Sequence, residues 1–324
     1  MVGAPGQLKI VFFGTPEVAV PALRALLEAG HELPLVVTQP DRPVGRSRRP
    51  VAPPVKRFAE SAGLAVEQPL KVRTRSFRER IGACRPDLLV VVAFGRILSA
   101  RLLDQTPLGA INLHFSLLPK YRGAAPVQWA LARGESATGV TTLRVNAMLD
   151  AGDMLLREEV AIEPGEHAPA LFERLAAIGA PLLVESVAGL ASGAIEPRPQ
   201  DDAAATLAPL LKTEDGWVDP AEHDARTIDG RIRGFDPWPG VWLMRGARRL
   251  RLVRGSIAEP QAETADPGRL TPIPGGGVVL QCANGTALRL LEVQPDGRGA
   301  LDVADAVNGR QIAVGERLEP VRPA

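Results

Sequence analysis

The sequence predicts an α/β fold with a mostly parallel sheet, followed by a small domain built mostly of β-strands. Residues 9–38 have the pattern of strand, helix and strand, which is typical of the start of a parallel sheet. Asp87–Ala93 is the most apolar strand-like run and has the composition of a strand buried on both faces. Beyond residue 209, short strand-like runs alternate with turn residues. We therefore expect domains at residues 1–192 and 209–324, joined by a linker of low apolar periodicity at 193–208.

The elements of the first domain follow from apolar patterns and from helix signals. Lys9–Gly14 indicates a strand, after which Thr15 can N-cap a helix that has Pro16 at its first position. This turn lacks the second and third glycines of the dinucleotide-binding fingerprint, so it does not predict a nicotinamide or flavin site. Later strands are expected at Leu33–Thr38, Asp87–Ala93, Gly109–His114, Gly139–Val145 and Met154–Val160, and a long amphipathic helix at His167–Leu190.

The second domain is predicted from strand-like runs separated by turns, for which a barrel is one arrangement. These runs are Val241–Met244, Arg249–Val253, Gly277–Gln281 and Thr286–Leu291. A cluster of arginines with no acid among them lies within and next to the first two runs, and in a hairpin such a cluster can form one basic face. Its members are Arg245, Arg248, Arg249, Arg251 and Arg254.

Composition narrows the functional classes. The net charge of +1 gives no overall field that would indicate a nucleic-acid partner, so any such site must be local. Cys84 and Cys282 are the two cysteines and lack metal-ligand spacing, which predicts free thiols in a reducing cytosol. The four histidines are scattered, so no metal is expected. We see no signal peptide and no run of the roughly 18 apolar residues that a membrane span needs. A monomer in the cytoplasm, without membrane contact, is the expectation.

Three polar residues form a candidate catalytic set. Asn112 and His114 are two residues apart on one expected strand, so their side chains share a face. An amide N–H can stabilise an oxyanion, and an imidazole, with a reference pKa of about 6.5, can exchange a proton at neutral pH. Asp150, in a turn between two strands, supplies a carboxylate that can orient the ring. This set suits acyl or formyl transfer, or hydrolysis. A nucleophilic-serine elbow of the GxSxG kind is absent.

Each of these residues also has an ordinary structural interpretation. His114 has the position of a satisfied, partly buried histidine, Asn112 that of an amide capping a loop, and Asp150 that of a turn residue before Gly152. From spacing alone, these roles are at least as frequent as catalysis. The long loop Gln39–Pro54 leaves a similar choice. It carries Arg42, Arg46, Arg48 and Arg49. Four arginines suit phosphate contacts, but from composition alone a solvated charge run is at least as frequent.

A series of motifs makes the chain resemble the folate-dependent formyltransferases, and within them those that formylate methionyl-tRNA. The strongest is Asn112-x-His114, followed by Ser116–Pro126 and then by Leu149–Met154. The others are Gly14–Glu17, Thr38–Arg46, Pro54–Lys56 and Phe235–Pro239. One short motif is weak, but this series covers nearly the whole chain in the right order.

The resemblance implies a doubly wound, Rossmann-like first domain that binds the formyl donor 10-formyltetrahydrofolate, and no metal. It also implies a second domain of barrel type, resembling an OB fold, that helps to hold tRNA. The implied reaction transfers the formyl group to the α-amine of initiator methionyl-tRNA, giving N-formylmethionyl-tRNA for translation initiation. Asn112, His114 and Asp150 match the catalytic trio of the family. The implied folate contacts are Ser116, Leu117, Leu118 and Pro119, with Phe94, Gly95 and Arg96 beside the pteridine.

For tRNA, the resemblance implies that the arginine loop, with Arg42, Arg46, Arg48 and Arg49, reaches the acceptor end. In the second domain, Arg248, Arg249 and Arg251 are the expected contacts. One departure is Phe115, which stands where the family usually has a small residue or proline. The alternatives are a formyltransferase for another amine, a formyl-folate hydrolase, and a tRNA-binding protein without catalysis.

Overall fold

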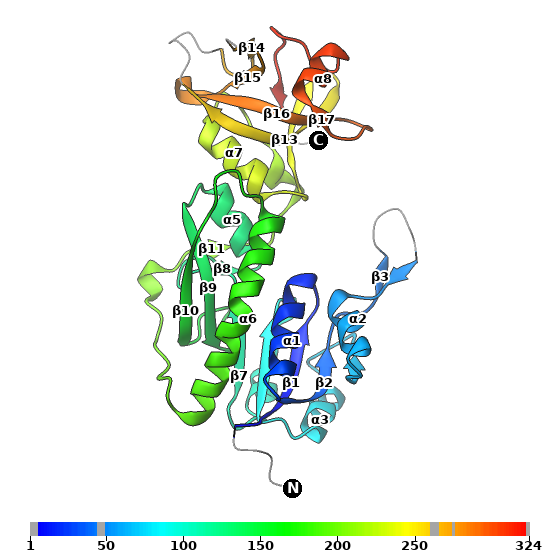
Figure 1. Cartoon of the computed structure of the whole chain (residues 1–324), viewed down its shortest axis with the longest axis vertical. Helices are drawn as coiled ribbons and strands as arrows, with labels where there is room; N and C mark the ends of the chain where they lie inside the picture. Colours follow the sequence, from blue (N-terminus) through cyan, green and yellow to red (C-terminus); the bar gives the residue numbers. More distant parts are fainter. Residues whose placement is uncertain (1–5, 44–48, 260–265, 274–275, 322–324) are drawn as a thin grey trace. The chain divides into compact units, whose positions relative to one another are not determined.

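The computed structural model describes residues 6–43, 49–259, 266–273 and 276–321 (Figure 1). The chain divides into two compact units. The first holds the described residues of Met1–Ala124, Ala137–Ala161 and Phe172–Ala208, and the second those of Ala125–Ser136, Ile162–Leu171 and Pro209–Ala324. Two short stretches that the sequence placed in the first domain therefore cluster with the second unit.

The first unit contains a seven-stranded sheet in the order β10-β9-β7-β6-β1-β2-β5. Its strands are β1 (Lys9–Gly14), β2 (Glu32–Val37), β5 (Val66–Glu67), β6 (Leu88–Val92), β7 (Ala110–His114), β9 (Ala137–Arg144) and β10 (Met154–Ala161). The pairs among β7, β6, β1, β2 and β5 are parallel, and β9 and β10 add on as antiparallel strands. The prediction of a mostly parallel sheet is confirmed. The direction in which successive strands are added to the sheet reverses between β1 and β6: β2 lies on one side of β1, and β6 lies on the other.

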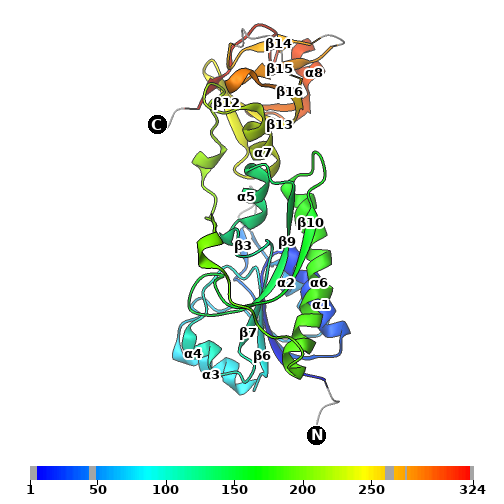
Figure 2. The same ribbon diagram turned by 90° about the vertical axis from the view of Figure 1, so that its left-hand side faces the viewer.

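Helices cover both faces of this sheet, with α1 and α6 on one side and α3 and α4 on the other (Figure 2). The helices are α1 (Val20–Glu28), α2 (Pro54–Ser61), α3 (Arg75–Ala83), α4 (Ala100–Leu103) and α6 (Ala168–Ser192), with a 3-10 turn at Glu17–Ala19. Successive side chains of each strand point to opposite faces of the sheet, so each face packs its own set of apolar side chains against the helices. Val11 and Phe13 pack with Phe77 and Ile81 of α3 on one of these faces. The sheet is thus buried on both faces, as the apolar composition of its strands requires.

Helix α6 corrects an expectation about membranes. Its 25 residues are long and apolar enough to cross a membrane by length and composition, although the sequence was expected to hold no such segment. The apolar composition has a reason within the first unit, because the helix packs against the sheet. The hydroxyl oxygens of Ser186 in α6 and Thr142 in β9 are 2.6 Å apart. The side chain of Leu113 in β7 lies against Gly179, where a Cβ would come within 3.0 Å of it.

The segment at 193–208 also differs from the free linker that its composition predicted. It contains a 3-10 turn at Asp202–Ala204 and strand β11 (Leu207–Ala208), which pairs in parallel with β8 (Arg122–Gly123). Arg198 forms an isolated bridge with Met154 of β10. These contacts use backbone atoms and involve no periodic apolar face, so the sequence carries little signal for them.

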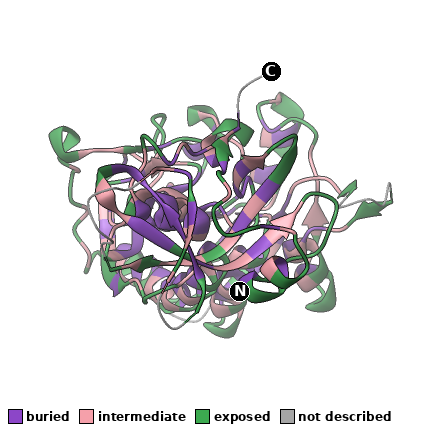
Figure 3. Ribbon diagram, turned by 90° about the horizontal axis from the view of Figure 1, so that it is seen from above, coloured by how far each residue is buried: buried purple, intermediate pink, exposed green. Residues whose placement is uncertain are grey.

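The second unit combines helices α5 (Pro126–Ala132), α7 (Ala225–Gly234) and α8 (Val303–Asn308) with an antiparallel sheet in the order β14-β15-β16-β13-β12-β18. Its strands are β12 (Val241–Arg245), β13 (Arg248–Ala258), β14 (Leu270–Pro272), β15 (Val278–Gln281), β16 (Ala287–Pro295), β17 (Leu301–Asp302), which pairs with β16, and β18 (Glu319–Pro320). Further 3-10 turns lie at Thr213–Gly216 and Ala283–Gly285. In Figure 3 the buried residues lie mainly on helices and strands, and the exposed residues lie in loops and on parts of the helices.

The two ends of this antiparallel sheet approach each other through backbone hydrogen bonds. Leu270 N–H donates to Glu316 O at 2.8 Å, and Leu318 N–H donates to Gly268 O at 2.8 Å. Residue 318 leads directly into β18, and residue 268 leads into β14. The sheet is therefore curled around a core in which Leu250, Leu280 and Leu288 are buried.

Candidate active site

The structure brings the three candidate catalytic residues together at the carboxyl end of β7. Asn112 and His114 lie on the strand, and Asp150 reaches them from the turn between β9 and β10. Asn112 Nδ2 donates to Asp150 Oδ1 at 3.1 Å. The other carboxylate oxygen, Oδ2, lies 3.7 Å from His114 Nδ1. The carboxylate thus lies between an amide N–H and an imidazole nitrogen, and all three groups belong to the first unit.

Burial and hydrogen bonds define the electrostatics of this cluster. His114 is 5% exposed, and the side chain of Asp150 is 11% exposed. The second ring nitrogen, His114 Nε2, is 3.0 Å from the carbonyl oxygen of Tyr121 and donates its proton there. Asp150 Oδ2 accepts the Gly123 N–H at 3.0 Å. The Nε2 contact leaves Nδ1 facing the carboxylate, which would attract a proton placed on Nδ1.

The turn after His114 contains the four residues that the resemblance assigned to folate. Most of its polar groups have partners within the turn and the sheet: Ser116 Oγ donates to Lys120 O at 2.7 Å, and Leu118 N–H donates to Thr141 Oγ1 at 3.2 Å. Ser116 and Leu118 are fully buried, whereas Leu117 and Pro119 are half-buried. Leu117 and Pro119 are therefore more accessible to a ligand than Ser116 and Leu118.

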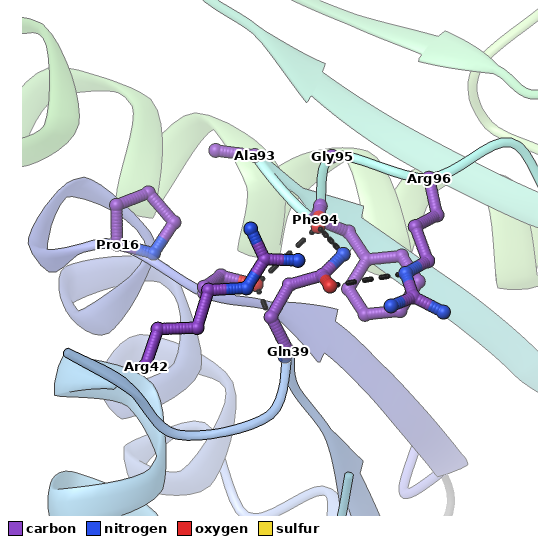
Figure 4. A pocket seen from close by; sticks show the side chains of 8 residues that line it. Pro16, Gln39, Arg42, Ala93, Phe94, Gly95 and Arg96 are labelled. Atoms are coloured by element: carbon purple, nitrogen blue, oxygen red, sulfur yellow. Dashed lines mark hydrogen bonds between the residues drawn. The ribbon is translucent and has the colours of Figure 1, made fainter. Parts of the chain in front are cut away.

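A pocket of about 340 Å³ lies at the carboxyl ends of β1, β2 and β6 (Figure 4). Its lining comprises Thr15, Pro16, Gln39, Arg42, Ala93, Phe94, Gly95 and Arg96. Phe94 O accepts hydrogen bonds from Gln39 Nε2 at 3.0 Å and from Thr15 Oγ1 at 3.3 Å, while Arg96 Nε donates to Gln39 Oε1 at 3.0 Å. The strand order reverses at this edge, which is where open α/β sheets bind ligands.

The pocket and the catalytic cluster lie on neighbouring strands of one sheet edge. Strand β6 pairs with β7 in a register that puts Val91 beside Asn112, and the chain enters the pocket lining two residues later, at Ala93. Of the residues predicted to bind folate, Phe94, Gly95 and Arg96 line the pocket. Within the described part of the chain, its lining includes neither the turn at 116–119 nor the three catalytic candidates.

Sequence reasoning missed Thr15 and Gln39 as parts of this pocket. Thr15 was expected to cap the first helix. This expectation is wrong, because Pro16 holds the N-cap position of the 3-10 turn and no side-chain hydrogen bond caps the turn. The Thr15 hydroxyl instead donates to Phe94 O and accepts the Gln39 N–H at 3.4 Å. A contact between three strand ends depends on the strand order, which local pattern does not specify.

The arginine loop is described only at its two ends. Arg42 and Pro43 form β3, which pairs with β4 (Pro50–Val51), and both Arg42 and Arg49 are exposed. Arg46 and Arg48 lie outside the described residues. Asp41, at the base of the loop, accepts from Gln68 Nε2 at 2.6 Å and from Lys56 Nζ at 3.0 Å. The hydrogen bond from Gln68, and next that from Lys56, hold the pKa of Asp41 below its usual range.

The second arginine cluster does not form one basic face. Arg251, whose side chain is 16% exposed, donates to Asp236 Oδ1 at 3.0 Å, and Arg245 Nε donates to Glu316 Oε1 at 2.6 Å. Arg248 and Arg249 at the start of β13 are exposed. The sequence showed no acid among these arginines, but acids from distant segments pair with them.

Phe115, the departure from the family pattern, is a core residue. It is 5% exposed, and its ring meets that of Phe172 in α6 edge to face, with centroids 5.7 Å apart. The large side chain fills space between the sheet and α6. It thereby holds the strand end that carries His114 against the helix.

The other expectations concern metal and thiols. Across the described residues, no group of three or more His, Cys, Asp or Glu side chains could hold a metal ion. Both cysteines are free thiols. Burial raises the pKa of Cys282 to about 12 and also raises that of Cys84. Neither sulfur therefore has the character of a nucleophile at neutral pH.

Comparison with known families supports the motif-based resemblance. Residues 8–187 match the family model described as formyl transferase, and residues 210–311 match the model described as formyl transferase, C-terminal domain. The chain is 49% identical over 312 residues to a methionyl-tRNA formyltransferase of Acidobacterium capsulatum, covering 96% of this chain and 99% of the relative. It is 44% identical over 311 residues to one of Geobacter sulfurreducens, covering 96% of each.

Solved structures show the same fold at lower identity. One is a sugar 3N-formyl transferase, WlaRD, with a TM-score of 0.65 and 14% identity over 90% of this chain and 99% of that one. Another is HypX from Aquifex aeolicus in complex with tetrahydrofolic acid, with a TM-score of 0.61 and 17% identity over 98% of this chain and 50% of that one. By its sequence matches over nearly its full length, the chain belongs to the formyl transferase family.

Proposed function

We propose that this protein transfers the formyl group of 10-formyltetrahydrofolate to the α-amine of initiator methionyl-tRNA, giving N-formylmethionyl-tRNA for translation initiation. The cluster of Asn112, His114 and Asp150 at a ligand-binding sheet edge is the observation that carries this proposal. Relatives that bear the name methionyl-tRNA formyltransferase, at 43–49% identity, support the choice of donor and acceptor. The reaction needs placement of two substrates and charge stabilisation, and both can come from these residues.

The proposed chemistry is a direct transfer through a tetrahedral intermediate. The neutral α-amine attacks the formyl carbon on N10, and the formyl oxygen becomes an oxyanion. The Asn112 amide and protonated His114 stabilise that oxyanion, while Asp150 keeps the imidazolium charged and helps to remove the amine proton, directly or through water. The C–N10 bond then breaks, N10 takes up one proton in exchange for the proton removed from the amine, and tetrahydrofolate is released.

The folate is proposed to bind in the pocket at the ends of β1, β2 and β6, with its formyl group toward the catalytic cluster. Phe94, Gly95 and Arg96 supply backbone atoms and a guanidinium to this pocket, which can hold a polar ring system. The turn at 116–119 completes the donor site in this proposal, mainly through half-buried Leu117 and Pro119. Residues 1–192 would thus form the donor-binding domain.

The tRNA is proposed to contact two arginine surfaces. In the first unit these are Arg42 and Arg49 at the described ends of the loop, together with Arg46 and Arg48. In residues 209–324, exposed Arg248 and Arg249 are favoured over Arg251, whose guanidinium already binds Asp236. We propose that this domain is a barrel resembling an OB fold; the curled antiparallel sheet with bonded ends supports this.

The proposed acceptor implies that the protein works in the cytoplasm, where translation is initiated. The catalytic cluster is complete within one chain, so a monomer suffices for the chemistry. In this proposal, neither a membrane nor a metal takes part.

One assay tests the proposal against its alternatives. The protein is incubated with 10-formyltetrahydrofolate and methionyl initiator tRNA, and the products are analysed for N-formylmethionyl ester and for free formate. Ester formation supports the proposal. Formate without ester would indicate a formyl-folate hydrolase. Donor consumption only with a different amine would indicate another formyltransferase, and tRNA binding without donor consumption would indicate a non-catalytic tRNA-binding protein.

A further inference from the structure

The backbone of Asp150 adopts a conformation that needs support. Its φ of 50° lies in the left-handed region, which is unfavourable for residues other than glycine and least so for Asp and Asn. The turn is also tightly packed at Gly152, where a Cβ would come within 1.8 Å of Arg144 O. Because the carboxylate reaches Asn112 and His114 only from this turn, whatever stabilises the turn also sets the catalytic geometry.

Gln200 bonds to the turn on both sides of its centre. Its side-chain nitrogen, Nε2, donates one hydrogen to Asp150 O at 2.8 Å and the other to Gly152 O at 2.7 Å. An amide nitrogen has two hydrogens, so both are used and the two carbonyls are tied to one group. Gln200 lies in the 193–208 segment, far from Asp150 in the sequence.

Arg122 fixes the orientation of the Gln200 amide. Its Nε donates to Gln200 Oε1 at 2.9 Å, and its Nη2 donates to Asp202 Oδ1 at 2.7 Å. A guanidinium is a donor only, so the amide must turn its oxygen toward Arg122 and its nitrogen toward the turn. The side chain of Arg122 is 11% exposed, which limits competition from water.

The two neighbours of Arg122 contact the catalytic side chains directly. Tyr121 O accepts from His114 Nε2 at 3.0 Å, and Gly123 N–H donates to Asp150 Oδ2 at 3.0 Å. The same stretch is anchored to the 193–208 segment through the hydrogen bond from Tyr121 N–H to Thr206 Oγ1 at 2.9 Å and through the β8–β11 pairing. The stretch around Arg122 therefore contacts both the His114 imidazole and the Asp150 carboxylate, and Arg122 connects this stretch to Gln200.

We propose that Gln200 is a positioning residue for the catalytic reaction, which it serves by holding Asp150 in its turn through the Arg122–Gln200 pair. This inference rests on the proposed formyl transfer. Gln200 itself touches neither His114 nor Asn112 through any described contact, and its effect on the reaction passes through the Asp150 backbone. The segment that joins the two units in sequence is then part of the active-site support.

The test replaces Gln200 by Met, which keeps the length and removes both donors, and by Glu, which keeps the pairing with Arg122 but removes the amide hydrogens. We expect each variant to lower kcat about 10- to 100-fold, because a misplacement of about 1 Å costs a factor of this order. The KM values for donor and tRNA should change less than threefold. This split between kcat and KM is what a positioning residue predicts, because the substrates still bind while the Asp150 carboxylate is displaced.

A matched control is Gln311→Glu, since Gln311 Nε2 also donates to a backbone carbonyl, that of Gly309 at 3.1 Å, in the second unit. It should leave kcat and both KM values unchanged. Wild-type kcat in both Gln200 variants would overturn the inference. The inference would also be overturned if folate affinity fell by as large a factor as kcat and the melting temperature fell as well, because these changes show a merely structural role. An inactive wild-type protein would instead overturn the proposed function.

Discussion

The catalytic edge of the first unit and the arginines of the second unit both looked like functional clusters in the sequence, but they differ in the structure. At the catalytic edge, Asn112, His114 and Asp150 converge, and both carboxylate oxygens of Asp150 and the Nε2 atom of His114 have protein partners. The arginines diverge, because distant acids pair with Arg245 and Arg251 and leave Arg248 and Arg249 exposed. The comparison teaches that a polar cluster in sequence becomes a site only where the fold makes its members meet.

The largest effect is expected from substitutions of the catalytic residues themselves. His114→Ala and Asp150→Ala should each lower kcat by about 10³-fold or more, because each removes charge stabilisation or proton transfer in the transition state. Folate should still bind, since the pocket at the ends of β1, β2 and β6 does not include these side chains. Single-turnover formylation and equilibrium folate binding give the two measurements.

Asp104→Ala is a suitable control for the acidic substitution, because Asp104 is exposed at the end of α4. It should leave turnover unchanged. Turnover close to wild type in His114→Ala or Asp150→Ala would remove these residues from the mechanism.

A smaller effect concerns the arginine loop, where Arg42 lines the pocket and is also proposed to contact tRNA. Arg42→Ala should lower kcat/KM for methionyl-tRNA about 10-fold, the size of one lost charge-assisted contact. The donor KM should stay unchanged, and the salt dependence of tRNA use should become shallower by roughly one unit of log–log slope.

Arg101→Ala provides the matched control, since Arg101 is exposed on α4 and does not line the pocket. It should change none of these quantities. A raised donor KM in Arg42→Ala, with tRNA use intact, would assign this arginine to the folate.

The smallest effects separate two arginines that share a face of β13. Arg249→Ala should raise the KM for tRNA by about threefold to tenfold and leave the melting temperature unchanged, because Arg249 is exposed. Arg251→Ala should instead lower the free energy of unfolding by about 1–2 kcal/mol, because it breaks the partly buried hydrogen bonds to Asp236 and Pro237. Thermal unfolding and tRNA kinetics on both variants are the measurements. The reverse pattern would place Arg251 on the tRNA.

Much of the sheet could be predicted from the sequence, because each strand carries a local apolar signal. The expected run Asp87–Ala93 became β6 (Leu88–Val92), and Gly109–His114 became β7 (Ala110–His114). The packing of helix α5 on helix α7, by contrast, had no such local signal. That packing depends on Gly234, where a Cβ would come within 2.4 Å of Gln128 O, and on the edge-to-face contact of Trp129 with Phe235.

By itself, the sequence determined the alternation of strands and helices, the shared face of Asn112 and His114, and the motifs that carry the family resemblance. These features depend on local periodicity and on residue identity, and both can be read directly from the amino-acid sequence. Only the tertiary structure decided which acid pairs with which arginine, that Phe115 packs on α6, and that Gln200 supports Asp150. The physical reason is that single hydrogen bonds and ring contacts between distant segments leave no periodic pattern in a sequence.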